Sequence, residues 1–315
     1  MKEKPNRLKW HMLFIITLMA LAVGVYSVSK TINYNWQWQR VLPYIVDTSA
    51  IDIIAEDNGE ASVTKEGVIT IHFDSSDQPL IITDADSIII ADGDLVYEGD
   101  LLARKNNMKM GILIEGLLVT LELSIISLFF AIIIGLIAAL MRISDNPFSK
   151  NFSLLYIELI RGTPLLVQIF IVYFFLGTVF DLERFTAGII ALSVFSGAYV
   201  AEIIRSGIQS IPVGQMEAAR SLGMRYPQAM AYVVLPQAFK RTLPPMAGQL
   251  INLIKDSSLV SVISITDLTK AGREAVSGSF ATFEVWFAVA ALYLLLTSTL
   301  SWGVQRIEKR LANND

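Results

Sequence analysis

The chain has 315 residues, of which 53% are hydrophobic and 17% are charged, with a formal net charge of −4. Soluble domains carry roughly a quarter charged residues, so this composition excludes an ordinary soluble protein and indicates a membrane protein. The sequence contains no cysteine, which excludes disulfides, zinc fingers, iron–sulfur sites and a thiol nucleophile. With only two histidines, His11 and His72, it offers little basis for a histidine metal site or a catalytic triad.

Six apolar stretches are candidates for membrane spans, since a helix needs about 20 mostly apolar residues to cross a bilayer. In chain order they are residues 12–28, 112–140, 153–180, 185–204, 242–265 and 283–304. The fifth is the poorest, because Lys255 and Asp256 interrupt it. The first follows a basic start and is either a signal peptide or a retained anchor. Its apolar run exceeds the roughly 7–15 residues of a signal peptide, so we expect an anchor.

Lysine and arginine near the ends of the spans predict the orientation of the chain. After six crossings, most of the basic segments fall on one side of the membrane. These are the N-terminus, the loop with Arg142 and Lys150, residues 205–241 and the C-terminus. This predicts that both termini are cytoplasmic. The residues that would lie outside, against the rule, are Arg104, Lys105, Arg184, Lys270 and Arg273.

Residues 46–100 differ in character, with fourteen Asp or Glu against a single basic residue, Lys65. Short β-prone runs at 51–54, 68–73, 80–82, 87–90 and 95–97 are separated by glycine turns, which predicts a small β-rich domain outside the membrane. Its charge serves either solubility or the docking of a soluble partner. A calcium site on Asp92-Gly93-Asp94 is a weaker alternative, because the ordered EF-hand spacing is absent.

The segment 211–241 predicts two short helices between two spans. Pro212 can begin the first helix and Gly223 can end it in the left-handed conformation. The second can begin at Pro227, and we expect Leu235-Pro236 to interrupt it before the next span. Small residues in the first helix would let another protein approach closely, and an acidic one would offer a charge; these are Glu217, Ala218 and Ala219. Taken alone, the segment is equally an interfacial amphipathic hairpin.

These residues resemble the EAA motif of ABC importer permeases, in the order Glu217-Ala218-Ala219, Gly223, Val233, Leu235-Pro236. Three further stretches, 161–168, 196–207 and 252–260, are similar to signatures of the polar amino acid uptake branch, which contains histidine, glutamine and arginine permeases. The resemblance extends from about residue 111 to the C-terminus. It implies that segment 211–241 is a coupling segment that sits in a groove of a cytoplasmic ATPase.

The fold expected from this resemblance is an all-α polytopic membrane protein with a type I ABC importer permease core of about five spans over 111–310. An N-terminal basic region and span (1–30), an acidic extracytoplasmic domain (31–110) and a short tail (311–315) would be added to it. The resemblance implies a non-catalytic permease subunit of an ATP-driven importer of polar amino acids, working by alternating access in a prokaryotic cytoplasmic (inner) membrane.

The implied partners are an ABC ATPase dimer, a second permease subunit (homo- or heterodimeric), an extracytoplasmic amino-acid-binding protein and membrane lipid, with no nucleic acid. The sequence has no G-x-x-x-x-G-K-[ST] phosphate loop. We therefore expect no cofactor in this chain, and ATP and Mg to be bound by the ATPase.

Several residues are candidates for a gate or a structural corner. Thr163-Pro164, after Arg161-Gly162, predicts an N-cap followed by proline at the first helical position. Glu202 and Arg205 are three apart on a helix and can pair. The pair would either hold its helix against segment 211–241 or stay solvated and add little.

Lys255 and Asp256 indicate a path for substrate, because charges inside a span normally face a bundle interior or a water-filled route. Gln249, Asn252 and Asp256 share one helical face, and Ser257 follows. Such a face can bind the ammonium and the carboxylate of an amino acid, or it can bond neighbouring helices or a second permease.

Two other functions stay open at this level. An ion-coupled secondary amino acid transporter or channel fits the Lys255–Asp256 pair but leaves segment 211–241 without a role. A membrane-anchored sensor or adhesion protein fits the acidic segment but leaves five further spans unexplained.

Overall fold

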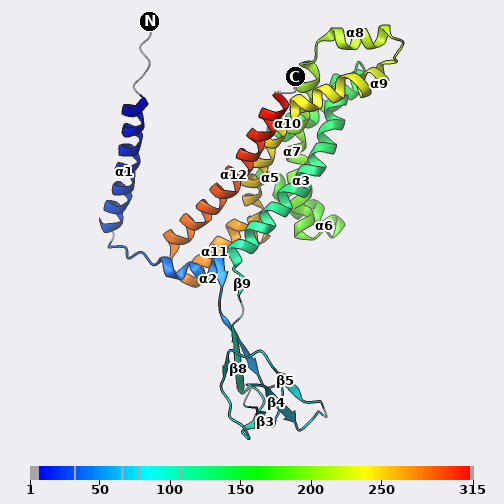
Figure 1. Ribbon diagram of the computed structural model, residues 1–315. Helices are drawn as coiled ribbons and strands as arrows, with labels where there is room; N and C mark the ends of the chain where they lie inside the picture. Colours follow the sequence, from blue (N-terminus) through cyan, green and yellow to red (C-terminus); the bar gives the residue numbers. More distant parts are fainter. Residues whose placement is uncertain (1–6, 32, 65–66, 77, 107, 313–315) are drawn as a thin grey trace. The chain divides into compact units, whose positions relative to one another are not determined.

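The computed structural model describes residues 7–312 except 32, 65–66, 77 and 107 (Figure 1). The chain divides into two compact units, Met1–Gln39 and Arg40–Asp315. The first unit contains α1 (Arg7–Thr31), whose apolar part is Met12–Val28. The second unit contains all the other helices and strands described below, apart from a 3-10 turn at Trp38–Arg40 that lies across the boundary.

The second unit begins with α2 (Leu42–Ile45) and a set of strands. These are β1 (Val46–Asp47), β2 (Ala50–Ile54), β3 (Gly59–Val63), β4 (Ile69–Phe73), β5 (Leu80–Ile82), β6 (Ser87–Ile88), β7 (Leu95–Val96), β8 (Leu101–Asn106) and β9 (Lys109–Met110). The helices that follow are α3 (Ile112–Ile143), α4 (Pro147–Arg161), α5 (Leu165–Phe170), α6 (Gly177–Phe180), α7 (Arg184–Gln209), α8 (Val213–Ser221), α9 (Tyr226–Ala229), α10 (Leu235–Asp256), α11 (Leu268–Ser279) and α12 (Thr282–Ala312). Turns of π-helix at Ile171–Leu176 and Met230–Val234 join α5 to α6 and α9 to α10, and a 3-10 turn at Ser257–Ile263 follows α10.

In the described part of the chain, three helices are long and apolar enough to cross a membrane: α3, α7 and the Thr282–Arg306 part of α12. They lie on the second, fourth and sixth predicted stretches. The third stretch is broken, because α4 and the segment Leu165–Phe180 meet at an angle of 104°. The stretch 153–180 therefore falls on two helices, and the direction change lies at the Thr163-Pro164 corner expected from the sequence. Proline cannot donate an N–H and disfavours helical geometry in the residue before it, so α4 ends ahead of Pro164.

The fifth predicted stretch falls on α10 and the 3-10 turn after it, and does not meet the same criteria of length and apolarity. The expected interruption at Leu235-Pro236 is also wrong. The π-helical turn Met230–Val234 runs directly into α10, with Pro236 in the first turn of that helix. A π turn changes the bonding pattern locally, so the backbone stays helical through this proline.

Small residues bring α3 and α7 into close contact in the helical core (Figure 1). A Cβ built on Gly135 of α3 would lie 2.6 Å from Cγ1 of Val200 in α7, and one on Gly197 would lie 2.9 Å from Cγ2 of Ile134. Small residues at helix interfaces let backbones approach closely in membrane proteins. The α3–α7 pair is the centre on which α4, α5, α10 and α11 pack.

The strands form antiparallel sheets with their own apolar core. One sheet has the order β5–β4–β3–β7, a second β2–β8–β6, and a short pair β1–β9 joins Val46 to Met110. Ile69, Ile71 and Leu102 are fully buried in this core. β2, β4, β5, β6 and β7 fall on the β-prone runs, whereas β3 and β8 do not. β8 carries Arg104-Lys105 and is a strand because β2 and β6 flank it.

Carboxylates of the β segment accept backbone hydrogen bonds, four of them within local turns and two, at Asp86 and Asp92, from distant residues. Backbone N–H groups donate to Asp47, Asp57, Asp86, Asp92, Asp94 and Asp100. Aspartate favours turns because its side chain can accept local backbone hydrogen bonds. The Asp57 carboxylate also accepts from the Ser75 hydroxyl, and this bond holds its pKa below the usual value.

Asp92 and Asp94 accept from Val63 and Ala91 at 2.9 and 2.7 Å rather than facing a common point. Over the residues described, no group of three acidic, histidine or cysteine side chains converges as a metal site would require. The basic residues Arg104 and Lys105 pair with Asp52 and Asp84. They are strand residues of this segment rather than residues flanking a span.

Candidate functional site

In segment 211–241 a tight glycine turn separates the short helix α8 from α9, which continues through the π turn into α10 (Figure 1). Pro212 was expected to be the first residue of α8. In the structure it is the N-cap of this helix, which begins one position later at Val213. At the other end Gly223 has φ +90°, its N–H donates to the Arg220 carbonyl, and the Met224 N–H donates to the Ala219 carbonyl. These two bonds are the Schellman pattern, which needs a residue in the left-handed region, usually glycine. Gly223 therefore fixes where α8 ends.

The outer surface of α8 combines a charge with uncovered apolar side chains. Glu217 and Ala218 are exposed, whereas Ala219 is buried against the rest of the segment. Val213 and Leu222 are 71% and 85% exposed. The exposed surface of α8 thus carries one carboxylate and, near its two ends, two apolar side chains.

Hydrogen bonds brace segment 211–241 on both sides. Gln237 of α10 donates to the Gln215 side chain of α8 at 3.4 Å and to the Val233 carbonyl at 2.9 Å. Arg241 of α10 donates to the carbonyl of Ser210, at the end of α7, at 2.6 Å. Leu235 is half-buried and Pro236 exposed. These bonds link α8 to α10 and α10 to the end of α7.

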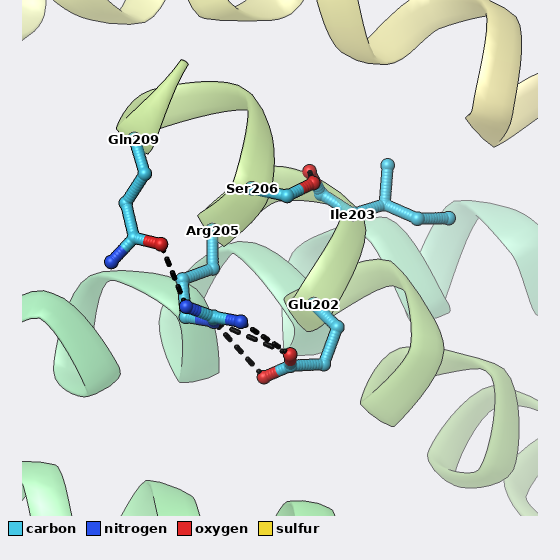
Figure 2. A network of polar contacts seen from close by, with 5 residues as sticks. All are labelled: Glu202, Ile203, Arg205, Ser206 and Gln209. Atoms are coloured by element: carbon cyan, nitrogen blue, oxygen red, sulfur yellow. Dashed lines mark hydrogen bonds and ion pairs between the residues drawn. The ribbon is translucent and has the colours of Figure 1, made fainter. Parts of the chain in front are cut away.

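Glu202 and Arg205 form a two-pronged ion pair at the end of α7, shown in Figure 2. Arg205 Nη2 lies 2.8 Å from Glu202 Oε2, and Arg205 Nε lies 3.2 Å from Oε1. Arg205 Nη1 also donates to Gln209 at 2.7 Å. Both side chains of the pair are about 70% covered, since 26% and 30% of their surfaces are exposed. The fork geometry holds both side chains in one arrangement.

The corner between α4 and α5 is held by Gln168. Its Nε2 donates to the Ile160 carbonyl and to Thr163 Oγ1, both at 2.8 Å. Thr163 itself donates to the Leu159 carbonyl and is not an N-cap; Pro164 occupies the N-cap position of α5. Thr163 was expected to be the N-cap and Pro164 the first helical residue, but the N-cap is Pro164. The Thr163 hydroxyl does not cap the helix because it accepts from the Gln168 amide instead.

The other corner residues lie on the surface. Gly162 is the C-cap of α4, and the Arg161 guanidinium lies over the Tyr199 ring at 5.2 Å. Gln168 belongs to the 161–168 stretch but was not selected as a site residue. Its signal was a single amide in an otherwise uncharged apolar run.

The candidate path residues of α10 do not converge on one pocket within the chain. Gln249 is buried, Asp256 is half-buried, and Asn252 and Lys255 are exposed. The Ser257 hydroxyl is buried and donates to the Ile254 carbonyl at 2.8 Å. The exposed members leave a polar strip on α10 that nothing else in the described chain covers.

A buried carboxylate, Asp267, was not singled out from the sequence. It is fully buried and caps α11, accepting from the N–H groups of Thr269 and Lys270 at 3.0 Å. The Tyr293 hydroxyl of α12 lies 3.4 Å from the same carboxylate. Its sequence signal was an aspartate directly before a helix, which is a common N-cap pattern.

The fold and these sites define a class: a polytopic helical membrane protein with a braced, exposed short helix, α8, between two longer helices. A family model described as "Binding-protein-dependent transport system inner membrane component" matches residues 131–313. The chain belongs to this family.

Curated relatives match with similar coverage. The glutamine transport system permease protein GlnP of Escherichia coli K12 is 40% identical over 203 residues, which is 64% of this chain and 93% of GlnP. The probable glutamine ABC transporter permease protein GlnM of Bacillus subtilis is 42% identical over 62% of this chain and 92% of its own. The arginine transport system permease protein ArtQ of the same organism is 37% identical over 64% and 94%.

Solved structures agree on the fold. A structure titled as an amino acid ABC transporter with histidines superposes with a TM-score of 0.59 at 43% identity, over 63% of this chain and 94% of its own. A chain of the MetNI methionine ABC transporter has a TM-score of 0.56 at 20% identity, over 64% and 96%. The match to the family model begins at residue 131, so α1 and the strands lie outside the matched region.

Proposed function

We propose that this chain is the permease subunit of an ATP-driven importer of polar amino acids, of the kind that relatives named for glutamine and arginine transport represent. The observation that carries the proposal is α8, with Glu217 and apolar side chains exposed beside a fixed Schellman turn at Gly223. A pair of ABC ATPases grips this surface and supplies ATP and Mg, so the permease itself binds no cofactor and catalyses no reaction.

The arrangement in the membrane follows from the charges. Segment 211–241 and both termini lie in the cytoplasm of a prokaryote, beneath the inner membrane. Helix α1 is an additional span, and its apolar stretch Met12–Val28 supports this. The strand segment between α2 and α3 is then an extracytoplasmic domain, and the soluble amino-acid-binding protein delivers substrate on the same side.

A second permease subunit completes the path. The uncovered polar strip on α10, with Asn252, Lys255 and Asp256, faces this second copy or paralogue across the path and contacts the substrate. Hydrogen-bond donors and acceptors on one face suit the ammonium and carboxylate of an amino acid. Closure of the ATPases moves α8, and the bonds from Gln237 and Arg241 carry the motion to α10 and α7.

The corner at Arg161–Pro164 and the Glu202–Arg205 pair act as hinges for this motion. Both lie at helix ends where the chain changes direction. Ligand and nucleotide then bias an equilibrium between inward-facing and outward-facing states.

The proposal is tested at Gly223. A valine there must adopt a positive φ, which costs roughly 1–3 kcal/mol, although no atom lies within 4 Å of the new Cβ. We expect Gly223→Val to reduce co-purification of the ATPase, and ATP-driven uptake of glutamine or arginine into proteoliposomes, about tenfold. Asparagine tolerates the left-handed region. Gly223→Asn should therefore retain most of the ATPase association and most of the uptake.

Gly214, in the same helix, offers a control. It has ordinary φ and open space around it, so Gly214→Ala should leave ATPase binding intact. Normal ATPase association and transport in Gly223→Val would refute the coupling role. Uptake driven by an ion gradient without ATP would instead favour the secondary transporter.

A further inference from the structure

A polar cavity of about 770 Å³ opens where the C-terminal ends of α3 and α7 meet the N-terminal ends of α4 and α9. Its polar walls come from four separate parts of the chain: Arg142, Asp145, Lys150, Asn151, Arg205 and Tyr226. It lies outside the candidate path on α10 and outside the exposed surface of α8. Among its basic residues only Arg205 has been given a role, in the pair with Glu202, and no role so far uses Arg142 or Lys150.

The cavity carries an excess of positive charge. Three cations line it against one carboxylate, that of Asp145. Arg205 is already bound by Glu202 and Gln209, so its charge is largely compensated. Arg142 is different: its Nε is buried and has no hydrogen-bond partner in the described structure. A buried donor left unsatisfied is costly, and in the described structure Arg142 lacks the pairing that Arg205 has.

The neighbouring helix α4 has the features of a helix that lies in a membrane interface. Phe148, Phe152, Leu155 and Leu159 are spaced four, three and four apart and are 75%, 56%, 62% and 57% exposed. They form one apolar stripe on the outside of α4. The helix turns by 104° into the segment that follows it, as a helix along the membrane surface must do to enter a span. An apolar stripe beside a polar face is typical of interfacial helices.

We propose that this cavity binds the phosphate of an anionic phospholipid whose acyl chains lie along the apolar stripe of α4. Arginine and lysine are the usual partners of phosphate oxygens, and basic pockets between helices at the cytoplasmic face recognise anionic headgroups. Arg142 and Lys150 supply the charge, while Asn151 and Tyr226 supply neutral donors. The stripe distinguishes a lipid from a free anion, because only a lipid uses the charged cavity and the apolar surface together.

The test uses the purified full chain in a neutral detergent, titrated with dioctanoyl phosphatidylglycerol or dioctanoyl phosphatidylcholine while thermal unfolding is followed. We expect the phosphatidylglycerol to bind more tightly and to raise Tm more. Each basic residue near an anionic surface contributes about a fivefold change in affinity. Lys150→Gln and Arg142→Gln should therefore each weaken phosphatidylglycerol binding about fivefold.

The control variant is Lys240→Gln, which removes an exposed lysine of α10 that does not line the cavity. It should leave the affinity unchanged. Lys150 is exposed, so Lys150→Gln should fold even if Arg142→Gln does not, and Arg142→Lys keeps the charge at this half-buried position. Inorganic phosphate is titrated in parallel to separate a lipid from a free anion.

Equal binding of the two lipids, or equal weakening by Lys240→Gln, would overturn the proposal. Protection by inorganic phosphate as strong as that by phosphatidylglycerol would assign the cavity to a soluble anion. Loss of ATPase binding in Lys150→Gln with unchanged lipid affinity would assign it to the ATPase. Because the readout is lipid binding by the permease alone, these outcomes are independent of the coupling test at Gly223.

Discussion

Asp267 and the residue after it connect three helices through side-chain and backbone contacts. Its carboxylate caps α11 and lies near Tyr293 of α12, while the Leu268 N–H donates to Thr120 Oγ1 of α3 at 3.1 Å. Gly116 of α3 lies against the Asp267 backbone, where an added Cβ would come within 2.9 Å of the carbonyl oxygen. The cap therefore also fixes how closely α11 approaches α3.

Replacing Asp267 with alanine should destabilise the chain by about 1–2 kcal/mol, the usual cost of a lost N-cap. Asparagine caps a helix about as well as aspartate, so Asp267→Asn should retain most of the stability. Thermal unfolding of the purified chain measures both variants. Equal Tm values for Asp267→Ala and the parent chain would show that the cap adds no stability.

Gln168 stabilises the corner between α4 and α5 through hydrogen bonds. Gln168→Met keeps the length of the side chain and removes its hydrogen bonds to Ile160 and Thr163. The unsatisfied acceptors should cost about 1–3 kcal/mol, measured as a lower Tm. Val167→Met at the exposed neighbour is the matched control and should change Tm little. A similar Tm for both variants would mean that proline alone sets the corner.

At the scale of elements, α3 and α7 can approach closely because glycines lie at their contact. The Gly135–Val200 and Gly197–Ile134 contacts leave no room for a larger side chain. Residues flanking this contact, such as Ala131 and Ala139, are fully buried. Both helices are apolar on other faces as well, so hydrophobicity does not select this pairing.

Gly135→Val should therefore cost about 1–3 kcal/mol through overpacking and reduce the yield of folded protein in detergent. Gly303 in α12 has no atom within 4 Å of a built Cβ, so Gly303→Val is the control for inserting valine into a membrane helix. Size-exclusion profiles and Tm compare the two. Greater loss in Gly303→Val would contradict the packing argument.

At the scale of the whole molecule, the strand segment and the helical core have separate apolar cores. The core of the strands is drawn from residues 53–103, whereas α2 contributes Val41 to the core of α3, α11 and α12. The β1–β9 pair closes the strand segment where it joins the helices, opposing Asp47 to Lys109. Opposed residues in such a pair lie roughly 5 Å apart, so a short linker can replace everything between them.

A chain in which two glycines join Asp47 directly to Lys109 should fold and bind the ATPase as the full chain does, because the helical core loses no packing contact. Co-purification of the ATPase and Tm in detergent test this. Failure of the shortened chain to fold, with β1, β9 and α2 intact, would show that the strand segment is part of the core after all.

Composition and spacing predicted much at the level of elements. The long apolar runs predicted α3, α7 and α12, and Pro212, Gly223 and Pro227 predicted the ends of α8 and the start of α9 within one residue. The strands β3 and β8 were missed, because their residues become strands only when flanked by partners. Gln168 and Asp267 each left a local pattern, a lone amide in an apolar run and an aspartate before a helix. The contact of Asp267 with Tyr293, 26 residues away, had no such pattern.

The sequence by itself determined that the chain is a membrane protein, where its long helices run and where α8 ends, because hydrophobic run length and glycine at a positive φ are local properties. Only the tertiary structure decided that Asp86 and Asp92 of the strand segment accept from backbone N–H groups of distant residues, and that Arg142, Lys150 and Arg205 share one cavity. These outcomes depend on hydrogen bonds and on packing between residues far apart in the chain, which no local pattern contains.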